Sequence, residues 1–388
     1  MLADTDAGSV ITAAQSGAQW GYRLLLLQLL IIPLLFVAQE LTVRLALSTG
    51  KGYGELILKR FGPWVATVPM VTLIISCFGA LVTEMSGLAG VGQLFGVPVW
   101  QTVGIVALAI FAMVCSGNYN TVERVALVLG VFEFAFFVVA WHARPDYGQM
   151  LAQLKDMPLT DRNYLYLLAA NLGTSIMPWT IFYQQSALID KGLDISHLKA
   201  ARLDTFSGAV LCQIITAAVL IAAAAAFGAH GGGMILDSVP QIAQAFTAVL
   251  GENAGRITFA IALSGGALVA TIVVCLSAAW AMGEISGRRH SLADHPRDAP
   301  WFYAAFGLML LAGAILVSSG VNLVRLAIAT GVINALLLPV ALGFLYWLAR
   351  NELPAQHRLK GAYACCVAAI FLITASVGLY AGISGALG

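Results

Sequence analysis

The stretch "LGTSIMPWTIFYQQSAL" (residues 172–188) decides the fold, because it is apolar enough for a membrane and yet contains a helix break. Pro178 lacks a backbone N–H, and its ring clashes with the preceding helical turn. Gly173 lets the chain leave helical geometry at little cost. In hydrocarbon every backbone polar group needs a partner, so such a break survives only inside protein or beside water. We therefore expect residues 173–178 to unwind inside a bundle of helices.

The composition is that of an integral membrane protein. Of the 388 residues, 60% are hydrophobic and only 10% are charged, and the mean hydropathy is +0.87. A soluble domain carries about 25% charged residues. The net charge of +1 argues against a nucleic-acid partner. All six cysteines fall in apolar runs without a Cys-x-x-Cys pair, and the six histidines lie at helix ends or in loops, so neither type predicts a disulfide, zinc or haem site.

Apolar stretches of about 20 residues predict membrane-spanning helices. A shorter helical piece at 6–18 precedes them, and no signal peptide stands apart from the spans. The predicted spans are 22–47, 64–92, 98–116, 122–142, 164–189, 203–228, 255–284, 301–319, 322–349 and 360–385. The loops 143–163 and 229–254 are long enough to hold some structure of their own.

Lysine and arginine in the loops predict the orientation in the membrane. With a cytoplasmic N-terminus, 14 of the 20 basic residues fall in inside loops and 6 in outside loops. This asymmetry puts the C-terminus outside, which requires an odd number of spans, so the opening segment counts as a span or part of one. We expect a multi-pass protein of the plasma (inner) membrane.

A second break candidate, Asp6-Ala7-Gly8-Ser9, lies in the opening segment. If that segment is helix one, the break at 173–178 falls in helix six, so five helices separate equivalent positions. Broken helices at corresponding places in two halves indicate a midplane site in an inverted-repeat transporter. Spacing alone fits equally well a single proline kink with a polar N-terminal tail.

Several stretches resemble the Nramp family of divalent metal transporters. "DAGSVITAAQSGAQWGY" (6–22) is similar to the family's first helix, in which Asp-Pro-Gly-Asn precedes a "GAQFGY" run. The stretch 172–188 looks like its sixth helix, built on Met-Pro-His. "QELTVRLALSTGKGYGELI" (39–57), "LFGVPVW" (94–100) and "RLDT" (202–205) also fit, so the likeness runs from residue 6 to about 210.

The resemblance implies an all-α integral membrane protein with an inverted-repeat, leucine-transporter-like bundle of about eleven helices. Residues 1–388 form one transporter domain, with repeats at about 1–142 and 164–349 and an extra final helix at 360–385. Family members carry further apolar residues before the first motif, whereas only Met1 to Thr5 precede Asp6 here. We therefore expect the first helix to be truncated at its N-terminus, either because the start codon is assigned too late or because the chain is a fragment.

Carried over by position, the resemblance implies a metal site between helices one and six. Asp6 is the acidic ligand, Ser9 stands where the family has asparagine, and Met177 takes the place of its thioether ligand. Backbone carbonyls near Ala7 and Thr174 add oxygens. A soft sulfur favours manganese or iron over calcium or magnesium. No cofactor is expected besides the transported ion, and the expected partners are that ion, the bilayer and, as an open option, protons.

Four departures from the family pattern leave the ion and its coupling open. Ser9 shortens the reach of the ligand oxygen and leaves room for a water, and Ala7 replaces a proline. Trp179 replaces a histidine, and Leu81 replaces an aspartate associated with proton movement, so proton coupling is in question. A related branch of the family is associated with magnesium and uncoupled transport; magnesium prefers oxygen ligands, so a retained Met177 argues against it.

Two further functions remain compatible with the sequence. One is an amino-acid or organic-cation symporter of the same fold, which would have a larger pocket. The second is a transport-dead remnant or leak, which the short N-terminus suggests. An enzyme is not expected, because the sequence offers no nucleophile–base pair and no clustered metal-binding histidines.

Three glutamates lie within predicted spans, where an ionisable group is costly and therefore a functional candidate. Glu84 matches a family glutamate and is assigned to the proton or ion pathway. Glu133 has no partner visible in the sequence and could line a water path. Glu40 is also a pathway candidate, although Arg44 follows it at helix-neighbour spacing that suits a structural ion pair.

Overall fold

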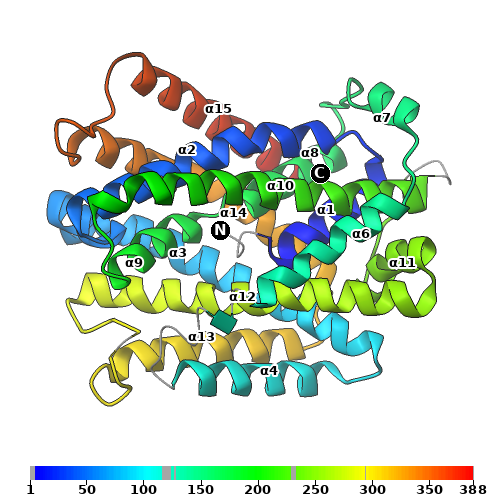
Figure 1. Cartoon of the computed structure of the whole chain (residues 1–388), viewed down its shortest axis with the longest axis horizontal. Helices are drawn as coiled ribbons and strands as arrows, with labels where there is room; N and C mark the ends of the chain where they lie inside the picture. Colours follow the sequence, from blue (N-terminus) through cyan, green and yellow to red (C-terminus); the bar gives the residue numbers. More distant parts are fainter. Residues whose placement is uncertain (1–4, 116–123, 126–127, 229–232, 293, 388) are drawn as a thin grey trace.

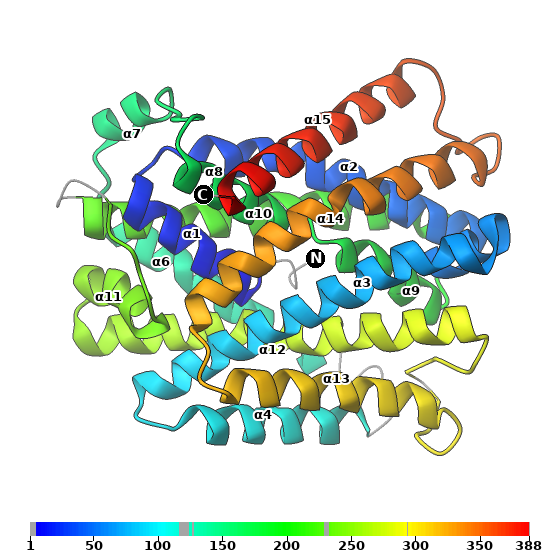
Figure 2. The same cartoon turned by 180° about the vertical axis from the view of Figure 1, so that it is seen from behind.

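The structure, a computed structural model, describes residues 5–387 apart from 116–123, 126–127, 229–232 and 293, and every regular element in this part of the chain is helical (Figures 1 and 2). In chain order the elements are α1 (Ala7–Trp20), α2 (Leu25–Thr49), α3 (Tyr53–Leu94), α4 (Val99–Val114), η2 (Phe132–Phe134), α6 (Ala135–His142), α7 (Tyr147–Gln153), α8 (Arg162–Ser175), α9 (Pro178–Asp190), η3 (Ile195–His197), α10 (Leu198–Gly228), α11 (Val239–Leu250), α12 (Glu252–Ser286), α13 (Pro300–Ser318), α14 (Leu323–Asn351) and α15 (Gly361–Ala386).

These helices confirm the predicted all-α membrane architecture. Within the described residues, eight helices are long and apolar enough to cross a membrane, or nine if the bent pair Val128–His142 and Tyr147–Gln153 is one span. Helices α1 and α4 are shorter, with 14 and 16 residues. The predicted span 122–142 lies partly outside the described residues, and its described part holds η2 and α6. The two long loops contain α7 and α11, as their lengths suggested.

Two of the helix contacts, α3 with α12 and α4 with α13, join corresponding helices of the two predicted repeats. Helix α3 packs along α12, and α4 packs along α13, so that α12, α13 and α4 lie side by side in both views (Figures 1 and 2). Helix α1 packs along α10, and α8 packs along α14. The start of α1 lies in the middle of the bundle (Figure 1), so its first residues sit at depth rather than at a surface.

Two of these helix pairs approach so closely that their backbones touch. A Cβ on Gly17 of α1 would collide with the Leu220 carbonyl oxygen and the Ala224 nitrogen of α10. A Cβ on Gly173 of α8 would likewise collide with the Gly331 carbonyl oxygen of α14. Small residues allow such approach, and in a membrane close packing takes over part of the role of the hydrophobic effect between helices.

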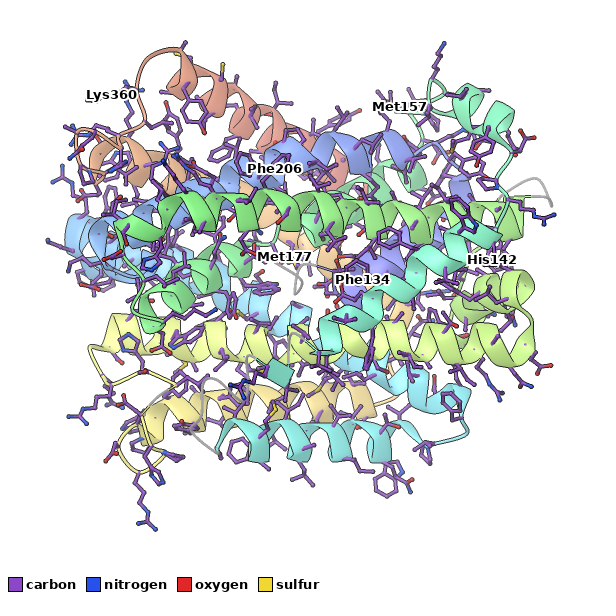
Figure 3. All side chains as sticks on the ribbon, in the orientation of Figure 1. Phe134, His142, Met157, Met177, Phe206 and Lys360 are labelled. Atoms are coloured by element: carbon purple, nitrogen blue, oxygen red, sulfur yellow. The ribbon has the colours of Figure 1, made fainter. Side chains whose placement is uncertain are left out.

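The surface has exposed tryptophans of the kind found in membrane proteins. Trp64, Trp100, Trp141 and Trp301 are all exposed, at 63–89% of their surface, near the ends of spanning helices. Exposed tryptophans at helix ends form the aromatic belts of membrane proteins. Figure 3 shows Lys360 at one end of the bundle and His142 and Met157 at the opposite end.

Basic residues assigned to the inside loops gather at the Lys360 end. Arg44 donates to the His357 carbonyl oxygen at 3.2 Å, and Arg60 lies 3.7 Å from the Glu352 carboxylate. Both contacts join the beginning of the chain to the loop between α14 and α15. We call this end the basic end.

Candidate metal site

The break in the sixth helix lies within the predicted segment 173–178 but is shorter than predicted, because Gly173 to Ser175 remain helical and Gly173 serves the close approach to α14 instead. Helix α8 ends at Ser175, and Ile176 and Met177 are both extended, with φ/ψ of −122°/94° and −99°/137°. Pro178 then starts α9 at the first helical position, where a missing N–H costs nothing. The chain here is therefore two helices joined by two extended residues rather than one kinked helix.

Asp6 caps the start of α1 and is almost completely buried. Its Oδ1 accepts the backbone N–H and the hydroxyl of Ser9, both at 2.6 Å. A carboxylate at a helix N-terminus is favoured by the unpaired N–H groups and by the helix dipole. Asp6 therefore has one oxygen committed to the helix start.

The predicted break at Asp6–Ser9 is a helix start in the described residues, since Ala7, Gly8 and Ser9 form the first turn of α1. Ser9 joins this helix start to the break between α8 and α9. Its Oγ lies 2.6 Å from Asp6 Oδ1 and 3.2 Å from the carbonyl oxygen of Thr174, at the end of α8. Gly8 sits between Thr83 of α3 and Thr174, and a Cβ there would lie 3.1 Å from the Thr83 methyl group. Four of the five predicted metal-site positions, Asp6, Ala7, Ser9 and Thr174, thus meet at one point.

Glu84 of α3 completes this cluster and is fully buried. Its Oε2 accepts the N–H of Ala7 at 2.9 Å, and its carboxyl group also interacts with that of Asp6. Its Oε1 has no hydrogen-bond partner in the described part of the chain. Two facing carboxyl groups in a protein interior cannot both stay charged without a proton or a cation between them. The donor set therefore fits a cation.

Met177 is buried at the N-terminal end of α9, near the middle of the bundle (Figure 3). Its Sδ accepts a hydrogen bond from the indole Nε1 of Trp179 at 3.0 Å. The tryptophan that replaces the family histidine is therefore bound to the thioether itself. Leu81, at the other altered position, is fully buried and packs against Gly313 of α13.

The other two acidic candidates differ in their surroundings. Glu40 forms a buried ion pair with Arg44, with a shortest distance of 2.5 Å, and a second one with Arg202 of α10 at 2.7 Å. This pairing agrees with a structural role for Glu40. Glu133 in η2 is fully buried, whereas its neighbour Phe134, labelled in Figure 3, is exposed.

A series of buried hydrogen bonds connects α2, α8 and α1. Gln28 of α2 donates to Asn171 Oδ1 at 2.7 Å, and Asn171 donates to Ser16 Oγ at 2.7 Å. Ser16 Oγ in turn donates to the Thr12 carbonyl oxygen. These hydrogen bonds connect α1, α2 and α8, so they fix the position of α1 relative to the end of α8.

The site is closed to solvent in this conformation. Asp6, Ser9, Glu84 and Met177 are each at most 2% exposed. Within the described residues no group of three or more histidine, cysteine, aspartate or glutamate side chains is placed to hold a metal. A cation here would thus rely on two carboxylates supplemented by neutral oxygens and the thioether.

The family is decided by a match over nearly the whole chain. The family model "Natural resistance-associated macrophage protein-like" (Nramp) matches residues 1–384. The chain belongs to the Nramp family. The resemblance that fades after residue 210 in the motifs therefore extends to residue 384.

Individual Nramp relatives are distant. A protein named divalent metal cation transporter MntH, from Ralstonia nicotianae, is 27% identical over 270 residues, which is 66% of this chain and 61% of that protein. The manganese transporter of Eremococcus coleocola has a similar structure, with a TM-score of 0.77, 18% identity and coverage of 100% of this chain and 86% of that chain. MhsT in complex with L-phenylalanine gives a TM-score of 0.63 at 14% identity, over 97% of this chain and 98% of that chain. These likenesses establish the transporter fold of the leucine-transporter type.

Sequence reasoning missed one buried acid in this Nramp chain. Glu284 of α12 accepts the hydroxyl of Ser186 at 2.5 Å and the N–H of Gly54 at 3.1 Å. It borders a cavity of about 410 Å³ that Arg288 and Asp294 also line. Glu284 ends the predicted span 255–284, and the rule that makes an intramembrane acid a candidate would have identified it. Its contacts tie α12 to α9 and to the start of α3.

Proposed function

We propose that this protein transports a divalent metal cation, manganese or iron, across the plasma membrane by alternating access. The observation that carries the proposal is that two buried carboxylic acids meet at the start of α1: Glu84 Oε2 accepts the N–H of Ala7, the residue after Asp6, and Glu84 Oε1 has no hydrogen-bond partner among the described residues. A divalent cation between the two carboxylates would neutralise both charges. The transporter fold and the relatives' names support the same conclusion.

The proposed ligands are Asp6, Ser9, Met177 and the backbone oxygens of Ala7 and Thr174. Hard oxygens and one soft sulfur suit manganese or iron. The hydrogen bond from Trp179 occupies the Met177 sulfur, so a metal that uses this thioether binds in competition with the indole N–H.

Glu84, Glu133 and Glu40 are the proposed proton or ion pathway. Glu84 adjoins the proposed ligands, and Glu133 is, like Glu84, completely buried. Glu40 lies toward the basic end, where an inward path would open. The transported ion is the proposed substrate, with protons as the candidate coupling ion and no cofactor.

The proposed organisation is one transporter domain over residues 1–388, with repeats at about 1–142 and 164–349 and an extra helix at 360–385. The pairing of α3 with α12 and of α4 with α13 supports it. We place the basic end in the cytoplasm and the C-terminus outside, because lysine and arginine favour the inside.

One observation favours magnesium transport without proton coupling as the second candidate. Leu81 and Trp179 fill two positions of the family's proton route with buried apolar side chains. Neither side chain can carry a proton at physiological pH. Uncoupled transport would follow if the remaining glutamates do not substitute for them.

Uptake into proteoliposomes tests the proposal. Manganese and magnesium are supplied separately, with and without a pH gradient, to the wild type, Asp6→Ala and Met177→Ala. Asp156→Ala and Met157→Ala, at the exposed end opposite Lys360, are matched controls. Saturable manganese uptake lost in both site variants supports the manganese or iron proposal. Magnesium uptake that ignores Met177 and the pH gradient favours the second candidate, and no saturable uptake contradicts both.

A further inference from the structure

Gln213 of α10 has a completely buried side-chain amide that forms no hydrogen bond within the part of the chain that the structure describes. It is 0% exposed, and neither its Oε1 nor its Nε2 has a hydrogen-bond partner among the described residues. An unpaired buried polar group costs free energy for each atom left unsatisfied. Native proteins keep few such groups, and a bound water or ion is one common explanation.

Gln213 lies on the face of α10 that contacts α1. Leu220 and Ala224, whose backbone atoms meet Gly17, mark that face. Leu220 follows Gln213 by seven residues, which is two helical turns, so both residues point to the same side of the helix. The two helices run in the same direction, because Gly233, beyond the end of α10, donates to the Gln19 carbonyl oxygen at the end of α1.

The depth of Gln213 matches the start of α1. Seven residues back along a helix is about 10 Å. The same step back from Gly17 leads along α1 to Val10, in the first turn of the helix that Asp6 caps. The amide therefore faces the first turn of α1, the turn that Asp6 caps, from the α10 side, whereas Glu84 contacts the start of α1 from α3.

We infer that Gln213 places its amide oxygen in the coordination shell of the transported cation, directly or through one water. This inference rests on the proposed function and adds a ligand from α10, a helix that supplies none of the ligands proposed above. The site has a serine hydroxyl at position 9 where the family has an amide, and that hydroxyl is bound to Asp6. Gln213 would return an amide oxygen to the site from the α10 side. A neutral oxygen adds coordination without adding charge, so the ion can still be released.

The test compares Gln213→Leu with the wild type in the purified full-length protein, with two measurements. The first is the Kd for Mn²⁺ by titration calorimetry, and the second is the melting temperature without metal. We expect Gln213→Leu to weaken Mn²⁺ binding by about tenfold, as loss of a supporting ligand contact does. We expect its metal-free melting temperature to stay equal or rise, because the leucine removes an unpaired buried amide at similar volume.

Three further variants make the result specific. Gln213→Glu keeps an oxygen at the same reach and should bind Mn²⁺ at least as tightly as the wild type. Thr205→Val removes another buried polar group of α10 and should leave the Kd unchanged. Asp6→Ala should abolish binding.

Two sets of results overturn the inference, and they differ from failure of the proposed function. An unchanged Kd in Gln213→Leu, with binding lost in Asp6→Ala, overturns the role of Gln213 alone. A lower metal-free melting temperature in Gln213→Leu with a proportionate loss of binding assigns the residue a structural role and also overturns it. A wild type that binds no Mn²⁺ overturns the proposed function together with this inference.

Discussion

The indole N–H of Trp179 donates a hydrogen bond to the sulfur of Met177 over 3.0 Å, at the N-terminal end of α9. Both side chains are buried, so this bond is formed in a region that excludes water. A thioether is a weak acceptor, and here its lone pair also belongs to a proposed metal ligand. The tryptophan thus competes with the metal for the sulfur.

Trp179→Phe should therefore strengthen the binding of soft cations. Losing one neutral hydrogen bond of about 1 kcal/mol corresponds to about a fivefold lower Kd for Cd²⁺. Binding of Mg²⁺, which prefers oxygen, should not change. Trp280→Phe is the matched control, because Trp280 is also buried but its Nε1 has no hydrogen-bond partner among the described residues. Equal effects of the two variants on Cd²⁺ binding would contradict the competition.

Glu84→Gln should weaken Mn²⁺ binding by at least about tenfold, because it removes one of two negative charges facing the ion in a region of low dielectric. The glutamine oxygen can still accept the Ala7 N–H, so the start of α1 should stay in place. Calorimetric titration with Mn²⁺ measures the change. Glu55→Gln, at a partly exposed pair with Lys51, is the control and should bind normally. Wild-type affinity in Glu84→Gln would exclude Glu84 from the site.

Gly173→Ala should destabilise the fold, because its Cβ would collide with the backbone of α14. Overpacking of this kind costs about 1–3 kcal/mol. The melting temperature in detergent measures the loss. Gly104→Ala in α4 has nothing within 4 Å of the new Cβ and should be neutral or slightly stabilising. If the two variants melt at the same temperature, α8 and α14 are not packed backbone to backbone.

Glu40→Gln should destabilise the basic end, because Arg44 and Arg202 would lose their shared carboxylate. Breaking a buried pair costs about 3–5 kcal/mol, and the lower end applies because Arg202 is partly exposed. Thermal unfolding reports the loss, and Mn²⁺ uptake by the remaining folded protein shows whether Glu40 also acts in transport. An unchanged melting temperature combined with altered uptake would instead favour the pathway role.

The helices could be predicted because their signals are local. The run of apolar residues locates each span. Pro178, which follows Gly173 by five positions, locates the break between α8 and α9. The meeting of Asp6 with Thr174 followed from the family likeness rather than from any local pattern. It depends on packing between segments more than 160 residues apart.

The rest of the site could not be predicted from the sequence because it depends on which side a residue faces. Gln213 and Glu284 are single polar residues in apolar runs, and only the neighbouring helices decide whether they have partners. The bond from Trp179 to Met177 is invisible in the sequence for another reason. The two residues are only two positions apart, and their side chains meet because Met177 is extended while Trp179 is helical.

The glycine contacts described for the fold determine which parts of the molecule can move. Gly17 brings α1 against the backbone of α10, and Gly173 brings α8 against that of α14. Neither α1 nor α8 can therefore rotate without its partner. With the basic end in the cytoplasm, as proposed, opening toward the outside must move α1 with α10 and α8 with α14 as rigid pairs. Opening toward the basic end can be done by α9 alone, pivoting on the extended residues Ile176 and Met177. The two gates of such a carrier would therefore differ in size. One requires two helix pairs to move together, whereas the gate at the basic end requires only α9 to move, with its hinge beside the proposed ion site.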